Sequence, residues 1–234
     1  MRSGIFYTAR YLRIQRRVKD FLNAQDDFLS PATIGSTRAV GDAIQEILSQ
    51  NFGQLLGDVC AECSTEFARR AMADVAFSDR EGIYYVVDVK THRTDTVFNM
   101  PNLTSVERLA RFYESDSNCF VVLLVSYTIR RNRAVISEVR FVPIEFLGWN
   151  CLTIGALGWG QIQIANSNRI TLKPQYSRKA WMLEMCDRLL DFYPREIAKI
   201  GKRIERFRQV KQFWKRKPDV WTAPRIEKPK VISS

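Results

Sequence analysis

Two pairs of strand-forming segments constrain the fold of this chain more than any other feature of its sequence. Residues 71–78 and 83–90 are mostly apolar, and the polar tetrapeptide Asp79-Arg80-Glu81-Gly82 lies between them. Residues 120–128 and 134–142 are rich in β-branched and aromatic residues, and a short arginine-rich segment separates them. Segments of this composition, bounded by turn residues, are typical of β-hairpins. The sequence therefore predicts two hairpins.

Helical periodicity dominates much of the remaining chain. Tyr11, Ile14, Val18 and Phe21 recur at helical spacing, which predicts a basic amphipathic helix over residues 5–29. Further helices are expected at 39–55, 104–115, 177–192 and 195–214, with a polar loop at 91–103 and a short strand at 161–165. Pro194 then lies where the last helix begins, a position that proline favours. This order predicts an α/β fold in which helices flank a mixed central β-sheet.

The length of 234 residues suits one domain with extensions. We expect a single domain over residues 1–217, which comprises the N-terminal helix, a core at about 38–166 and the C-terminal helices at 177–214. A basic tail is expected at 218–234. The sequence holds no uninterrupted apolar run long enough to span a membrane, which predicts a soluble protein.

The charge balance indicates a polyanionic partner. The chain holds 36 Lys and Arg residues against 25 Asp and Glu residues, a net charge of +11. Such an excess is typical of proteins that bind nucleic acid, and less often of those that bind a membrane surface. Residues 195–217 alone hold ten Lys and Arg residues and two Glu residues. That segment suits equally a helix that faces phosphates and one that flanks a dimer interface.

The cysteines favour a reducing compartment. They number five: Cys60, Cys63, Cys119, Cys151 and Cys186. An odd number without a secretory signal predicts the cytoplasm. Cys60 and Cys63 have no second pair and no nearby histidine, and a zinc site needs four ligands, so their spacing is interpreted as chance or packing.

The residues that point to chemistry lie in the first hairpin. Asp88-Val89-Lys90 ends an apolar run, and charged groups at the end of a buried strand are costly unless they are paired or functional. If the turn is the common three-residue loop with Gly82 in the left-handed conformation, pairing continues until Asp74 faces Asp88. Lys90, two residues further on, then shares the same face of the sheet. A four-residue loop would instead pair Asp74 with Val87 and separate the group.

Two carboxylates this close repel each other unless a cation lies between them. An all-oxygen site with open positions suits Mg²⁺, which can bind a phosphate oxygen and lower the pKa of a bound water. Lys90 could orient or deprotonate that water, or stabilise the transition state. The alternative interpretation is a surface ladder of Asp and Lys side chains on a hairpin.

These residues resemble a known nuclease signature. Asp74 followed by Asp88-Val89-Lys90-Thr91 is similar to the PD-(D/E)xK motif, with Ala73 where that family often has proline. More specifically, the order of motifs resembles the HincII/EcoRV-like type II restriction endonucleases. Three further segments follow in the same order as in that family. They are Asn99-Met100-Pro101-Asn102-Leu103, the Gln161-Ile162-Gln163-Ile164 strand and the helix start Ser177-Arg178-Lys179-Ala180-Trp181.

The resemblance implies a restriction-endonuclease-like fold and a homodimer that cleaves double-stranded DNA at a short palindromic site, leaving blunt ends. Asp74 and Asp88 would ligate Mg²⁺, and Lys90 would be the catalytic lysine. Some relatives add a glutamate from an early helix, and Glu46, like Gln45 and Asp42, lies near that place in the sequence. A cognate DNA methyltransferase is expected in the same system.

The resemblance also indicates residues that contact DNA. Asn99 matches a side chain that intercalates between base steps in the family, and Asn102 matches a groove-facing asparagine. An asparagine amide can read an adenine edge, although turn chemistry is the alternative for a loop asparagine. The same loop contributes Met100 and Thr104 to the expected DNA-binding residues. His92 is either a phosphate contact beyond the catalytic strand or a plain loop histidine.

Other function classes fit the sequence less well. His92 is the only histidine, which excludes HNH and phospholipase-type nucleases. Another PD-(D/E)xK enzyme, acting in repair or junction resolution, would share the acids and differ in the shape of its substrate. A non-catalytic DNA-binding protein on the same fold would not need Asp74, Asp88 and Lys90 together, and neither would a basic structural or membrane-surface protein.

Overall fold

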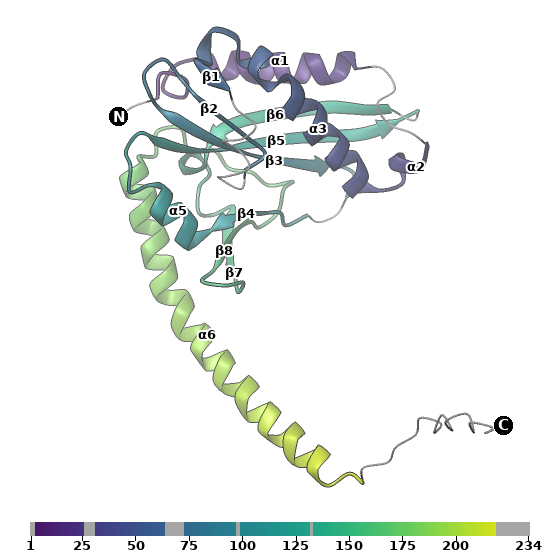
Figure 1. Ribbon diagram of the computed structural model, residues 1–234, viewed down its shortest axis with the longest axis vertical. Coiled ribbons are helices and arrows are strands. Elements are labelled where there is room, and N and C mark those ends of the chain that lie inside the picture. Colours follow the sequence, from purple (N-terminus) through teal and green to yellow (C-terminus); the bar gives the residue numbers. More distant parts are fainter. Residues whose placement is uncertain (1–2, 26–30, 64–72, 97–98, 132, 219–234) are drawn as a thin grey trace, which may run out of the picture. The chain divides into compact units, whose positions relative to one another are not determined.

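The computed structural model describes residues 3–25, 31–63, 73–96, 99–131 and 133–218, which divide into two compact units at Leu189/Leu190. The first unit contains a five-stranded mixed sheet in the order β1-β2-β3-β5-β6 (Figure 1). Its strands are β1 (Glu62–Cys63), β2 (Val75–Ser78), β3 (Tyr84–Arg93), β5 (Asn118–Arg130) and β6 (Arg133–Pro143). β3 and β5 are parallel, and the other neighbours are antiparallel. The predicted α/β class with a mixed sheet is therefore confirmed.

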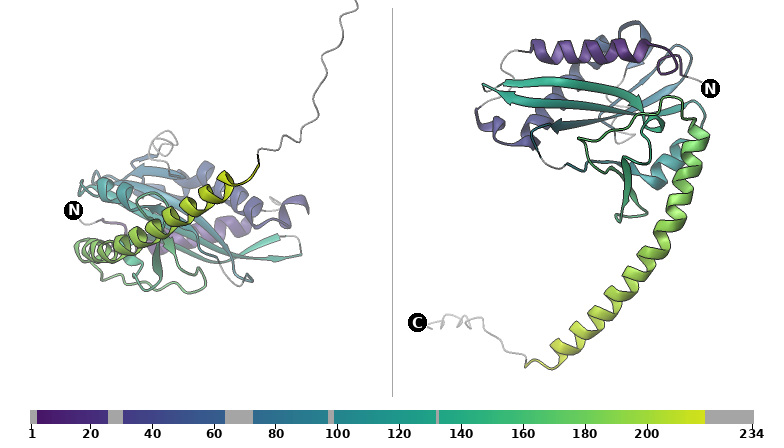
Figure 2. Two further views of the ribbon diagram at one scale, coloured as in Figure 1. Left: turned by 90° about the horizontal axis from the view of Figure 1, so that it is seen from below. Right: turned by 180° about the vertical axis from the view of Figure 1, so that it is seen from behind.

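The first unit also contains several helices. They are α1 (Arg10–Ala24), α2 (Pro31–Ile34), α3 (Thr37–Leu56) and α5 (Val106–Phe112), with 3₁₀ turns at Gly57–Val59 and Ile144–Phe146. Helix α1 packs along β6 and helix α3 against β3, as the view from behind shows for α1 (Figure 2). In each helix the buried residues recur every four positions, which produces a single apolar stripe that faces the sheet.

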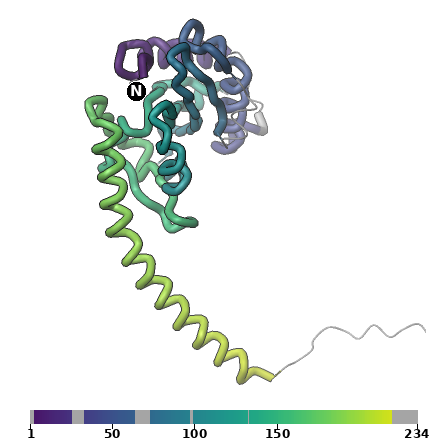
Figure 3. Tube along the Cα trace, turned by 60° about the vertical axis from the view of Figure 1, so that its left-hand side comes forward, coloured from purple at the N-terminus to yellow at the C-terminus, as the bar shows by residue number. Residues whose placement is uncertain are grey.

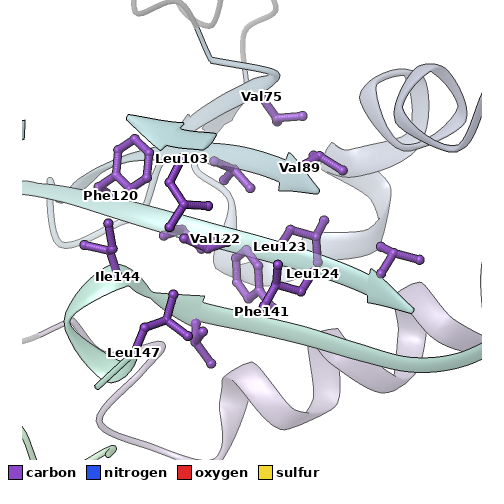
Figure 4. Packing of buried hydrophobic residues seen from close by; sticks show 14 of the residues in the cluster. Val75, Val89, Leu103, Phe120, Val122, Leu123, Leu124, Phe141, Ile144 and Leu147 are labelled. Carbon is purple, nitrogen blue, oxygen red and sulfur yellow. The ribbon is translucent and has the colours of Figure 1, made fainter. Parts of the chain in front are cut away.

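The centre of the core is β5. All six residues from Phe120 to Val125 are buried, as expected for an inner strand covered on both faces. Phe141 of β6 and Leu103 contribute side chains to the same apolar cluster (Figure 4). On β2 and β3, the rings of Phe77 and Tyr85 stack with their centroids 4.6 Å apart.

A second, three-stranded antiparallel sheet lies in the same unit, in the order β4-β8-β7. Its strands are β4 (Asn102–Ser105), β7 (Leu152–Gly155) and β8 (Gln161–Ile164). Residues 91–103 are thus not a simple loop as predicted, because β3 continues beside β5 to Arg93 and Asn102 starts the pairing with β8. The helix expected at 104–115 starts two residues later, where Ser105 accepts a hydrogen bond from the Arg108 amide.

Two further corrections concern the ends of the first unit. The N-terminal helix begins at Arg10 rather than at residue 5, and residues 26–29 of its predicted range lie outside the described residues. Cys60 and Cys63 form a disulfide, whereas their spacing was interpreted as chance or packing.

The C-terminal helices are one helix, α6 (Arg178–Lys215), with Pro194 inside it rather than at a helix start. The chain can be followed through it from green to yellow in Figure 3. In its first turns the Trp181 ring stacks on Trp149 at 4.8 Å, and the Trp181 indole N–H donates to the Leu147 carbonyl at 2.9 Å. The second unit, from Leu190 onward, consists of the rest of this helix as far as the structure describes it.

The packing of α3 yields a prediction about stability. Leu48 is fully buried on the sheet-facing stripe, so Leu48→Ala should lower the free energy of unfolding by about 2–5 kcal/mol. The same truncation at Leu12 of α1, which is 42% exposed, serves as the matched control and should change it by less than about 1 kcal/mol. Urea unfolding followed by circular dichroism measures both. Equal effects of the two substitutions would contradict the assigned helix faces.

Candidate active site

The turn between β2 and β3 sets the register of the site. Gly82 has a φ of +78°, and its amide donates to the Asp79 carbonyl at 3.2 Å. The Asp79 amide donates to the Ile83 carbonyl at 3.1 Å, and pairing continues to Val75 opposite Val87. The three-residue loop and its register are therefore as predicted, and one further residue along this register places Asp74 opposite Asp88.

The Asp79 side chain stabilises this turn. Its Oδ1 accepts from the amides of Glu81 and Ile83 at 3.0 and 2.9 Å, and its Oδ2 accepts from the Tyr85 hydroxyl at 2.7 Å. These three donors give both oxygens of the buried carboxylate a hydrogen-bond partner. Asp79 therefore acts on the register of the hairpin, several residues away from the acids that the register brings together.

Asp74 is held in a fixed orientation by two elements. Its Oδ2 accepts from the Val89 amide at 2.6 Å, and its Oδ1 accepts from the Gln45 side-chain amide of α3. Burial raises the pKa of the Asp74 carboxyl, and the hydrogen bond from Val89 and the charge of Lys90 oppose that rise. Helix α3 can approach this closely because Gly41 faces Thr91, where a Cβ atom would lie 2.6 Å from the Thr91 hydroxyl oxygen.

Asp88 is the site residue whose carboxyl pKa departs furthest from its usual value. Its Oδ1 lies 2.6 Å from the Lys90 ammonium nitrogen, whereas its Oδ2 is buried and has no hydrogen-bond partner within the described part of the chain. Burial raises the pKa of the Asp88 carboxyl to about 7; Lys90 lowers it, and the charge of Asp74 raises it. Asp74, Asp88 and Lys90 thus interact at one end of the hairpin. Among the described residues, Asp88 Oδ2 has no hydrogen-bond partner.

A cavity of about 340 Å³ adjoins Asp88. Its apolar wall includes Val86, Leu103 and Phe120, and Arg108 and Arg111 of α5 also line it. Thr104 lines it too, and the buried Thr104 hydroxyl has no hydrogen-bond partner among the described residues. Two buried oxygen atoms without partners therefore belong to residues that line one cavity. Unsatisfied buried polar atoms are uncommon in folded proteins, and they are typical of places where a ligand or water binds.

Helix α3 supplies a different residue from the one expected. Glu46 is exposed and accepts a hydrogen bond from Gln50 at 3.4 Å, and it is the neighbouring Gln45 that contacts Asp74. Successive helical residues point about 100° apart, so only one of the two can face the hairpin. Glu46 is therefore wrong as an auxiliary ligand in this arrangement.

The expected DNA-contacting residues separate into buried and exposed groups. His92 is only 5% exposed; its Nε2 lies 2.6 Å from the Asn168 side-chain oxygen, and its Nδ1 lies 3.5 Å from the Asn99 amide nitrogen. A ring held on both sides joins two loops and does not face solvent for a phosphate contact. Asn168 was not expected from the sequence, since nothing local links it to a histidine 76 residues away.

Met100 and Asn102 remain on the surface, whereas Thr104 is buried beside the cavity. The Asn102 side-chain oxygen accepts from the Gln163 amide of β8 at 2.6 Å, across the β4–β8 pair. This contact presents two amides side by side on an exposed strand pair. In the sequence, Gln163 was visible only as part of a strand motif. The structure brings it beside Asn102, the residue expected to contact bases.

The side chains of this site supply only some of the ligands that a hard cation needs. Within the described residues, no group of three or more His, Cys, Asp or Glu side chains is placed to bind a metal. Two carboxylates, one with a free oxygen, are nevertheless present, and Mg²⁺ commonly takes one or two carboxylates and completes its shell with water and substrate oxygens. The residues therefore fit Mg²⁺ as an open, partly hydrated site.

Comparison with known proteins identifies no relative: no protein family and no curated protein matches the chain. Among the described helices, none is both long and apolar enough to cross a membrane.

The pKa of Asp88 yields a stability prediction. Asp88 keeps its proton up to about pH 7 when folded but ionises near 3.8 when unfolded, so its burial destabilises the protein increasingly as the pH rises through that interval. Asp88→Asn should therefore raise the free energy of unfolding by about 1–4 kcal/mol at pH 8 and by much less at pH 4. Thermal unfolding at the two pH values measures this difference.

The exposed Asp58 provides the control for that measurement. Asp58→Asn should change the melting temperature by little at either pH. A stabilisation by Asp88→Asn that does not grow between pH 4 and pH 8 would show that the Asp88 carboxylate is not strained by burial.

Proposed function

We propose that this protein is a Mg²⁺-dependent endonuclease that hydrolyses phosphodiester bonds of double-stranded DNA, with a restriction-endonuclease-like fold of the PD-(D/E)xK type. One observation carries the proposal: the hairpin register brings Asp74, Asp88 and Lys90 together, and the buried Asp88 Oδ2 has no partner among the residues that the structure describes. A structural Asp–Lys ladder would satisfy both carboxylate oxygens or expose them to water, so the unpartnered oxygen favours a ligand site.

The residues divide the chemistry among them. Mg²⁺ held by Asp74 and Asp88 would polarise a phosphate oxygen and lower the pKa of a bound water. Asp74 needs no reorientation to bind, because the Val89 amide and Gln45 already hold it. Asp88 loses its proton on binding a cation, so affinity rises with pH around its pKa of about 7. With a cation bound, Lys90 would no longer be the only positive charge beside Asp88. Its ammonium group can then donate to the attacking water or to a phosphate oxygen.

The substrate class follows from charge. A net charge of +11 favours a polyanion, and electrostatic contacts to phosphates supply most non-specific DNA affinity. We further propose that cleavage is site-specific at a short palindrome with blunt ends, that the enzyme acts as a homodimer, and that a cognate DNA methyltransferase belongs to the same system. The supporting observation is the order of motifs in the sequence, together with the exposed Asn102–Gln163 amide pair.

Loss of either acid should abolish cleavage. Asp74→Ala and Asp88→Ala should leave no measurable cutting of plasmid DNA in Mg²⁺ while DNA binding persists, and Lys90→Ala should lose on the order of 10²-fold or more in rate. Asp58→Ala, on an exposed turn outside the site, should cut at the wild-type rate. Substantial cleavage by either acid variant would refute the assignment.

Metal binding can be measured without catalysis. Titration calorimetry with MgCl₂ should give binding to the wild-type protein that strengthens from pH 6 to pH 8 and is lost in Asp88→Asn.

Digestion of mixed-sequence DNA then separates the nuclease classes, because discrete fragments indicate a restriction enzyme, and smearing or cleavage confined to branched DNA indicates a repair or junction-resolving enzyme.

The Asn102–Gln163 pair generates a separate expectation. Asn102→Ala should reduce discrimination between a cognate site and a single-base variant by about 1–3 kcal/mol per contact, because a bidentate amide contributes that much. The melting temperature should change little, since Asn102 is exposed. The measurement is the ratio of cleavage rates on the two sites. An unchanged ratio would mean that sequence is read elsewhere on the surface.

A further inference from the structure

A largely exposed apolar stripe follows the helix of the second unit. Between residues 197 and 218 the structure buries no side chain, and Ile197, Ile204 and Phe207 are 69%, 50% and 70% exposed. The stripe repeats at alternating steps of three and four residues, with a single polar member, Lys211: Leu190, Tyr193, Ile197, Ile200, Ile204, Phe207, Lys211 and Trp214. This heptad spacing, sustained over more than three repeats, is typical of a coiled-coil seam.

Apart from Lys211, the charges of the same helix lie off this stripe. Arg195, Lys199, Lys202 and Arg206 occupy positions on the opposite and outer faces of the heptad. A helix that only bound phosphates would need its basic face and would have no reason to keep a continuous apolar one. The pattern therefore requires an apolar partner of similar length.

We propose that residues 190–207 pair with the same segment of a second copy of this chain as an antiparallel two-stranded coiled coil. In the register that centres the two helices between residues 198 and 199, Ile197 packs on the partner's Ile200. Leu190 then lies beside the partner's Phe207, and Tyr193 beside the partner's Ile204. Each layer is apolar on both sides, and two-fold symmetry repeats it at the other end.

Charge complementarity selects the antiparallel orientation. A parallel pair would place the two Lys211 ammonium groups next to each other in the seam and Arg203 beside the partner's Arg208. The antiparallel register moves the two Lys211 residues to opposite ends of the pair and places Arg203 beside the partner's Glu196. Glu196 is ion-paired with Lys199 of its own helix at 2.6 Å, and the partner's Arg203 adds a second cation to it.

The excess of basic residues predicts an unusual salt dependence. Residues 195–217 of each copy hold ten cationic and two anionic side chains, so the two helices repel each other outside the seam. Salt screens that repulsion over about 8–10 Å at physiological ionic strength. Dimerisation through this seam should therefore strengthen with salt, whereas binding of the same helix to DNA phosphates or to an anionic membrane would weaken.

The first test measures the mass of the full chain by analytical ultracentrifugation without DNA, at 50 and 500 mM NaCl. The wild-type protein should dimerise, with a lower dissociation constant at the higher salt concentration. Ile200→Asp, in the seam, should raise the dissociation constant at least tenfold. Ala198→Asp makes the same change of charge on the outer face of the helix and should leave the constant within about threefold.

Several outcomes would overturn the proposal. They are a monomer at both salt concentrations, dimerisation only when DNA is added, or dimerisation of Ile200→Asp equal to that of the wild type. The experiment uses no DNA and no activity, so failure of the coiled coil would leave the assignment of Asp74, Asp88 and Lys90 standing, and failure of the cleavage tests would leave the coiled coil standing.

The second test determines orientation and uses variants that keep the apolar seam. Arg203→Glu should weaken the dimer relative to Lys202→Glu, which makes the same charge change on the outer face. The double variant Glu196→Arg/Arg203→Glu should restore the wild-type dissociation constant. In a parallel dimer, Arg203→Glu would instead bind more tightly than Lys202→Glu, and that result would overturn the antiparallel arrangement. Circular dichroism checks that every variant remains helical.

Discussion

The three-residue turn between β2 and β3 is the constraint on which the candidate active site depends. Gly82 adopts the left-handed conformation and Asp79 binds the amides of the turn, so the loop has one length and the strands one register. A shift of one residue would turn every side chain of a strand to the other face of the sheet. Asp74 would then no longer lie opposite Asp88, and the group with Lys90 would not form.

Burial gives this arrangement its chemical character. Asp74 and Asp88 share a poorly hydrated end of the sheet, so burial raises the pKa of both, the charge of Asp74 raises that of Asp88 further, and a single lysine offsets only part of the rise. The protein tolerates that destabilisation because β5 and the helices beside it bury a large apolar core. Strain of this kind, localised at two acids and relieved by a cation, is typical of sites built to bind one.

The second sheet ties the cavity beside Asp88 to the surface. Strand β4 carries Thr104 into the cavity and Asn102 onto an exposed face, because its pairing with β8 is irregular between these two residues, which would otherwise point to the same side. A polymer bound over Asn102 and Gln163 would therefore meet an element that also lines the space next to the acids. This connection supports a role for the strand in coupling recognition to chemistry.

Local patterns in the sequence were enough to predict both hairpins, the turn that sets the first register, and the apolar stripe of α1. Each depends on residues close together in the chain, where turn geometry and periodicity act directly. The packed structure was needed to show that 91–103 contributes to two strands, that Gln45 rather than Glu46 contacts Asp74, and that His92 is buried against Asn168. Those outcomes depend on contacts between segments that are far apart in the chain and on how helix α3 is rotated where it packs. The free energy of such contacts cannot be inferred from the residues of one segment.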